Sequence, residues 1–124
     1  MHLCVASLLE CCRNLVLSSS NSSGASLAQQ FSFGNYVLNA SGIMSPNVYK
    51  KLNDRYQHYL FKLEIQSDLS FWAVGPQVGV NYLYLVHLDG NQRCPEYLAP
   101  NTWLYQNPTE QNWARDSTIS LTCL

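Results

Sequence analysis

Alternation of apolar and polar residues dominates this chain beyond residue 30, and it predicts β-strands. The clearest stretch is 56–65, in which Tyr59, Phe61 and Leu63 share one face. A period of two sustained over this length fits a strand and does not fit a helix, whose faces repeat every 3.6 residues. Segment 56–65 is therefore the most secure predicted strand.

Shorter strands are predicted around it, separated by turns rich in glycine, proline, asparagine and aspartate. The further predicted strands are 31–38, 48–52, 71–74, 80–88 and 118–123. Segment 80–88 is largely apolar on both faces, which is typical of a strand covered on both sides. We predict an all-β fold, a compact antiparallel sheet or sandwich of about six to eight short strands.

A helix is the alternative for residues 46–52, since Ser45-Pro46 has the chemistry of a helix start. The strand is favoured, because Val48 and Tyr49 are better strand formers than helix formers.

Residues 1–30 differ in composition from the rest of the chain, and this difference predicts a tail. Apolar residues at helical spacing precede a serine-rich run at 18–26. Glu10 and Arg13 interrupt the apolar part, which makes it a poor signal peptide. The pattern predicts a weakly ordered or short helical tail or linker, followed by a single β-rich domain at 31–124. No run of about 18 apolar residues occurs, so no membrane span is expected.

Charge is sparse and balanced. Charged residues make up 12% of the chain, with 7 basic against 8 acidic side chains and a net charge of -1. Nucleic-acid binding needs clustered lysine and arginine, so this class of partner is disfavoured.

The five cysteines fall into two groups. Cys94 and Cys123 are predicted to form a disulfide, whose loop the chain-entropy model values at ~3.6 kcal/mol; two reduced thiols are the alternative. Cys4, Cys11 and Cys12 are left unassigned. Zinc is disfavoured, because Cys11 and Cys12 are adjacent instead of two residues apart. No metal site and no cofactor are predicted.

Spaced glycine, aromatic and cysteine motifs run through the predicted domain. They are Gly34-x-Tyr36, Val48-Tyr49-Lys50, Tyr59-Leu60-Phe61, Trp72-x-x-Gly75-Pro76-x-x-Gly79, Cys94-Pro95, Trp103-x-Tyr105, Trp113-x-x-Asp116 and Ile119-x-Leu121-x-Cys123. In this order, residues 34–123 resemble a small β-rich module, containing tryptophan and cysteine, of invertebrate extracellular mosaic proteins. The resemblance implies adhesion or ligand contact without catalysis, in a secreted or extracellular protein.

Aromatic residues provide the candidate contact site. Trp103 and Tyr105 lie in a stretch with polar neighbours and flanking prolines, so they are predicted to be partly exposed and to bind a glycan or an extracellular protein. Trp72 and Trp113, within strand patterns, are predicted to be core residues. Two acceptor patterns for N-glycosylation occur, at Asn21 and at Asn39, the latter in a predicted loop.

Catalytic chemistry has weak support. On a strand, Asp54 and His58 would lie ~13 Å apart, so His58 is predicted to be solvated. His87 is predicted to be a hydrogen-bonded core or edge histidine. Glu96 and Asp116 could pair for sugar hydrolysis, but nothing in the sequence sets their separation. A small or truncated hydrolase, and an intracellular β domain with free thiols, stay as alternatives to an extracellular binding module.

Overall fold

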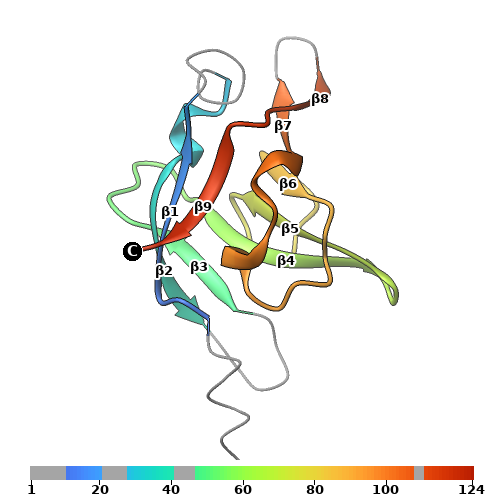
Figure 1. The fold of residues 1–124 in the computed structure, drawn as a ribbon, viewed down its shortest axis with the longest axis horizontal. Coiled ribbons are helices and arrows are strands. Elements are labelled where there is room, and N and C mark those ends of the chain that lie inside the picture. The colour runs from blue at the N-terminus through green and yellow to red at the C-terminus, as the bar shows by residue number, and fades with distance from the viewer. Residues whose placement is uncertain (1–10, 21–27, 41–46, 108–110) are drawn as a thin grey trace, which may run out of the picture.

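The protein is an all-β structure built on one curled antiparallel sheet (Figure 1). The structure is a computed structural model and describes residues 11–20, 28–40, 47–107 and 111–124. Within these residues the strands are β1 (Asn14–Ser19), β2 (Gly34–Ala40), β3 (Val48–Lys51), β4 (Tyr59–Gln66), β5 (Leu69–Gly75), β6 (Leu85–His87), β7 (Trp103–Asn107), β8 (Asn112–Arg115) and β9 (Ile119–Cys123). Three short 3₁₀ helices accompany them, η1 (Gln30–Ser32), η2 (Pro95–Tyr97) and η3 (Pro100–Thr102). The predicted fold class is confirmed, with nine strands described instead of six to eight.

The first and last described strands are neighbours in the sheet. The order is β8-β7-β6-β5-β4-β3-β2-β1-β9, so each strand from β1 to β7 pairs with the next, and β9 pairs with β1. The register places Leu17 opposite Leu121 and Leu15 opposite Cys123. In Figure 1 the blue β1 and the red β9 lie side by side. This pairing brings Cys123 close to Cys11 and Cys12, which precede β1.

The main core lies inside the curl of the sheet. Its fully buried side chains include Trp72 and Trp103, together with Tyr36 and Tyr49. A second apolar cluster forms on the opposite face of β4, β5 and β6. Its buried members are Phe61, Leu63, Ala73, Leu83 and Val86. Because successive strand residues point to opposite faces, β4 and β5 contribute to both clusters, and this explains their near-continuous apolar sequence.

Residues 14–19 belong to the sheet and not to a tail. Leu15 and Leu17 are buried while Val16 between them is half-buried, which is the alternation of a strand. The expected domain start at residue 31 therefore falls after the first strand of the domain. The expected helix was wrong for residues 14–19, and its remaining part at 1–10 lies outside the described residues.

Of two further predictions, one is confirmed and one boundary differs. Residues 48–51 form the predicted strand and not the alternative helix. The strand expected at 80–88 is reduced to Leu85–His87, because the chain before it folds back over the end of β5. A Cβ atom at Gly75 would lie 2.7 Å from the carbonyl oxygen of Tyr82, so glycine is required for this close approach.

Candidate ligand-contact site

The aromatic pair predicted as the contact site is part of the core. Trp103 is 0% exposed and Tyr105 is 8% exposed. Both lie on β7, an internal strand between β6 and β8, and both point into the curl of the sheet. Trp103 packs edge-on against His87, with ring centroids 5.2 Å apart. The prediction of an exposed site here was wrong, because a strand replaces the expected loop.

Of the other two tryptophans, one is buried as predicted and the other is exposed. Trp72 is buried in the main core, as predicted, and its indole N–H donates to the carbonyl oxygen of Gln92 at 2.8 Å. Trp113 is 42% exposed on the edge strand β8, so its assignment to the core was wrong. An edge strand with one flank unpaired leaves room for an exposed ring, and local sequence does not distinguish it from an internal strand.

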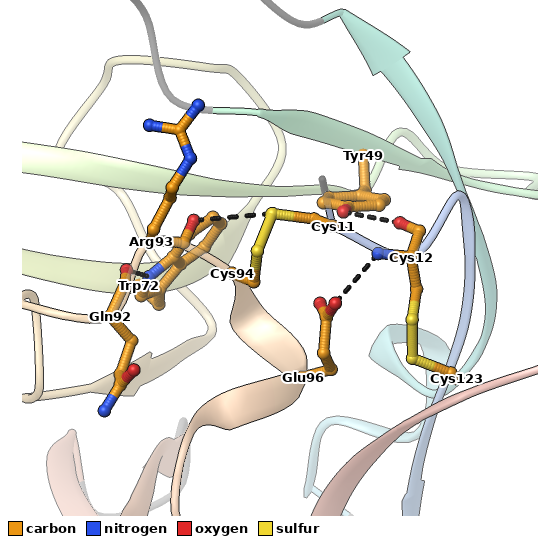
Figure 2. Close-up of a disulfide and its surroundings, with 9 residues drawn as sticks. All are labelled: Cys11, Cys12, Tyr49, Trp72, Gln92, Arg93, Cys94, Glu96 and Cys123. Carbon is orange, nitrogen blue, oxygen red and sulfur yellow. Dashed lines mark hydrogen bonds between the residues drawn. A yellow bond between two sulfur atoms is a disulfide. The ribbon is translucent and has the colours of Figure 1, made fainter. Parts of the chain in front are cut away.

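The cysteines pair between the two sequence groups and not within the second one. Cys11 is joined to Cys94 and Cys12 to Cys123, with Cα atoms 5.2 Å and 5.9 Å apart (Figure 2). The predicted Cys94–Cys123 bridge was therefore wrong. The pairing follows from the sheet, since β9 runs alongside β1 and ends where β1 begins.

Glu96 lies between the two disulfides, as Figure 2 shows. Its Oε2 atom accepts a hydrogen bond from the backbone N–H of Cys12 at 2.8 Å. The Tyr49 hydroxyl donates to the carbonyl oxygen of Cys12 at 2.7 Å. Burial, and then the nearby Glu96 carboxylate, raise the pKa of Tyr49 to about 12. We call Glu96 and the four bonded cysteines the disulfide node.

Glu96 and Asp116 have separate structural roles. Whereas Glu96 binds Cys12, the Oδ1 atom of Asp116 accepts hydrogen bonds from the Thr118 backbone N–H at 2.9 Å and from its hydroxyl at 2.7 Å. Asp116 thereby fixes the turn into β9. Each carboxylate thus has a local partner that stabilises the backbone, and this arrangement does not support the sugar-hydrolysis pair.

His87 is a buried, hydrogen-bonded residue, as predicted. Its Nδ1 atom accepts from the Asp89 backbone N–H at 3.1 Å, and its Nε2 atom donates to the carbonyl oxygen of Ala99 at 2.8 Å. The Thr102 hydroxyl oxygen also lies 2.5 Å from Nε2. With both ring nitrogens engaged, His87 stabilises the chain around β6 and η3.

Asp54 and His58 form a pair that the sequence analysis had separated. The Nδ1 atom of His58 lies 3.0 Å from Oδ2 of Asp54, and His58 is buried instead of solvated. The predicted strand begins only at Tyr59, and Asn53 takes a left-handed conformation with φ of 52°, so the chain turns between β3 and β4. Lys51 adds an ion pair with Asp54 at 3.8 Å. In the part of the chain that the structure describes, no hydroxyl or thiol is hydrogen-bonded to His58 as a nucleophile would be.

Two pairs of aromatic rings lie near Asp54 and His58, and three of the four rings are exposed while Tyr84 is half-buried. Phe31 and Tyr56, 53% and 50% exposed, pack edge to face with centroids 5.1 Å apart. Tyr82, 65% exposed, packs on Tyr84 at 5.9 Å. Tyr84 in turn lies 5.3 Å from the His58 ring. We call Phe31, Tyr56, Tyr82 and Tyr84 the aromatic surface.

Hydrogen bonds hold the segments that carry this aromatic surface. The Gln29 side chain donates a hydrogen bond to the carbonyl oxygen of Gln106 at 2.7 Å. The backbone N–H of Gln106 in turn donates to the carbonyl oxygen of Tyr84 at 2.8 Å. The hydroxyl of Tyr36 donates to the carbonyl oxygen of Ser32 at 2.6 Å, which fixes η1 against β2. Burial and then the Asp54 carboxylate raise the pKa of Tyr36, so this hydroxyl keeps its proton. The backbone on either side of Phe31 and near Tyr82 is therefore anchored by hydrogen bonds.

Sequence reasoning had no signal for this arrangement. Phe31, Tyr56 and Tyr82 come from three predicted strands far apart in the chain, where an aromatic residue is an ordinary strand former. Only the folding of these segments as loops and a 3₁₀ turn exposes them together.

The stronger glycosylation candidate, Asn39, lies on β2 instead of in a loop, and it is exposed. Its neighbour Ala40 ends the strand. Asn21 lies outside the described residues. An exposed acceptor near a strand end is compatible with the Asn-Ala-Ser pattern being modified.

Comparison with protein-family models, with curated proteins and with solved structures finds no match for this chain. Among the described helices, none has the length and apolar character needed to cross a membrane. A functional assignment therefore rests on the geometry of the chain itself.

Proposed function

We propose that this chain is a non-catalytic interaction module of the extracellular space that binds a glycan through the aromatic surface. The observation that carries the proposal is the exposure of Phe31, Tyr56 and Tyr82 on a hydrogen-bonded scaffold. Large aromatic rings normally bury much of their area in a core or an interface. Rings that are half exposed and already anchored offer contact area at small entropic cost to a ligand.

Two of the charges next to the aromatic surface are compensated within the protein, while Arg55, beside Tyr56, is exposed. The side chains of Lys51 and Asp54 are largely buried and form an ion pair with each other, and Asp54 also holds His58. Their charges are thus compensated within the protein. A sugar presents an apolar face of C–H groups for stacking on tyrosine and hydroxyl groups at its edges, and it needs no compensating charge.

The extracellular location is supported by the cysteines. Two disulfides connect the segment just before β1 to the residue preceding η2 and to β9, and such bonds persist in oxidising compartments and are rare in the cytosol. The exposed Asn39 acceptor adds to this support, and its occupancy would show as a carbohydrate mass on the secreted protein.

A hydrolase is the weaker candidate. Asp54 orients His58 as a carboxylate orients a catalytic base, but activation of a nucleophile would need a hydroxyl, thiol or water next to that base. The contacts of His58 with Asp54 and Tyr84 account for its burial as a structural residue.

The test is a survey of the secreted chain against immobilised glycans, matrix proteins and a general panel of hydrolase substrates. We expect capture by a set of neutral glycans and no turnover. Tyr56→Ala and Tyr82→Ala should each weaken glycan binding by about tenfold or more, the effect of losing an aromatic anchor. Tyr97→Ala, at an exposed tyrosine on η2, is the matched control and should leave binding unchanged. Binding that survives both surface variants, capture by matrix proteins alone, or turnover abolished by His58→Ala would contradict the proposal.

A further inference from the structure

The disulfide node gathers four sulfur atoms around one carboxylate. An oxygen atom of Glu96 and the sulfur atoms of Cys11 and Cys94 all lie within 4.8 Å of one another. An oxygen atom of Glu96 and the sulfur atoms of Cys12 and Cys123 also lie within 4.8 Å of one another. Glu96 is thus common to two triads of metal-ligating groups, and Figure 2 shows it between them.

Glu96 has an unused ligand atom. Its Oε2 atom accepts the Cys12 N–H, but its Oε1 atom is buried and has no hydrogen-bond partner among the described residues. A buried polar atom without a partner is uncommon and unfavourable. A cation bound at this oxygen would satisfy it.

The donor set selects the class of cation. Thiolates suit soft or borderline metals, and the combination of sulfur with one carboxylate oxygen is acceptable to Zn²⁺. Zinc lies ~2.3 Å from sulfur and ~2.0–2.2 Å from a carboxylate oxygen, so its ligand atoms are roughly 3.5–4 Å apart. The ligand atoms within each triad already lie within 4.8 Å of one another. Once the disulfides are reduced, side-chain rotations around Glu96, which both triads share, would bring sulfur atoms of the two triads to this spacing.

We propose that reduction of both disulfides converts the node into a tetrahedral zinc site, in which the Glu96 carboxylate and three of the four thiolates of Cys11, Cys12, Cys94 and Cys123 supply the ligands. Each disulfide takes two electrons and two protons from two thiol groups of a reductant, which becomes a disulfide in turn. The bound Zn²⁺ then displaces the protons of the cysteine thiols that coordinate it.

The adjacency of Cys11 and Cys12, which argued against zinc from sequence, has the opposite consequence in the fold. Consecutive side chains diverge, so one sulfur reaches Cys94 beside η2 and the other reaches Cys123 at the end of β9. Glu96 faces both. The metal would tie together the same three segments that the disulfides tie, so the node would survive a change of redox state. This inference stands independently of glycan binding.

The experiment uses the whole chain in the Cys4→Ser background, so that only the four node cysteines remain. Oxidised and fully reduced samples are titrated with Co²⁺ as a spectroscopic probe and then with Zn²⁺ against a chromogenic chelator. We expect no binding by the oxidised chain. The reduced chain should bind stoichiometrically, with the thiolate charge-transfer bands and intense visible bands of tetrahedral cobalt, which Zn²⁺ then removes.

Glu96→Gln should weaken Zn²⁺ binding by the reduced chain by at least about tenfold, the scale seen when polar support of a metal site is lost. Glu64→Gln, at an exposed residue of β4, is the matched control and should bind as the parent does. Equal affinity of Glu96→Gln and the parent would overturn the proposal.

Near-ultraviolet circular dichroism separates a folded site from binding by an unfolded chain, since unfolded cysteines also bind metals. The reduced, zinc-loaded chain should keep the signal of the buried Trp72 and Trp103 rings that the oxidised chain shows. A reduced chain that binds no Co²⁺, or that binds it while this signal is absent, would contradict the inference.

Discussion

The Nδ1 atom of His58 lies 3.0 Å from Oδ2 of Asp54, although the two residues are four positions apart next to a strand. The turn at Asn53 creates this contact and places the His58 ring against Tyr84. The pair thus connects the loop between β3 and β4 with the chain before β6, beneath the aromatic surface.

Loss of this pair should destabilise the fold. In Asp54→Ala the buried His58 loses its charged partner, and we expect the free energy of unfolding to fall by ~1–3 kcal/mol. Urea denaturation followed by fluorescence measures the change. Asp68→Ala, at an exposed position between β4 and β5, is the control and should change stability by no more than ~0.5 kcal/mol. Equal stability of the two variants would contradict a structural role for the pair.

The burial of Trp103 predicts a contrast between two tryptophans. Trp103→Ala empties a large volume of the main core and should cost ~3–5 kcal/mol. Trp113→Ala, at the edge strand, should cost much less because its ring is already partly in water. Thermal and urea unfolding of both variants provide the comparison, and a similar loss in the two would contradict the assignment of the core.

The disulfide pairing can be tested by alkylation of the folded, unreduced chain. Cys94→Ser should leave Cys11 open to alkylation, while Cys12 and Cys123 stay protected until reduction. Its stability should fall by ~2–5 kcal/mol, since the lost bond closes a long loop. Peptide mass mapping identifies the modified residue. Alkylation of Cys123 instead of Cys11 in this variant would contradict the observed pairing and support the Cys94–Cys123 bond predicted from the sequence.

The raised pKa of Tyr49 predicts that the folded protein loses stability at high pH. Because the folded state raises its pKa from 10.0 to about 12, the folded chain holds a proton that the unfolded chain releases between these values. The stabilisation is therefore fully present below pH 10.0 and is lost as the pH rises through about 12. Tyr49→Phe should lack this contribution.

Urea unfolding of the parent and Tyr49→Phe at a series of pH values measures the effect. At neutral pH the variant should be less stable by ~1 kcal/mol, since it loses the hydrogen bond to the Cys12 carbonyl oxygen. The difference between the two proteins should shrink above pH 10.0, where the parent loses the contribution of its tyrosine proton. A difference that stays constant throughout would contradict the raised pKa.

The amino-acid sequence by itself determined the class of fold and much of the strand content. The alternation along β4 and the strand-forming residues of β3 act locally, because neighbouring side chains on a pleated strand must face opposite sides. The burial of His87 and Trp72 also followed from their strongly apolar surroundings. These features depend on a few consecutive residues, and a sequence contains that information directly.

The tertiary structure alone decided the cysteine partners, the place of β1 and the exposed aromatic residues. Pairing of β1 with β9 joins the first and last described strands of the chain, and the free energy for it comes from burial of Leu15, Leu17 and Leu121 in a core shared by distant strands. The same pairing selects Cys12 as the partner of Cys123. Whether a ring such as Trp103 is covered, or one such as Tyr82 is exposed, depends on which strands lie beside it, and local sequence does not specify that.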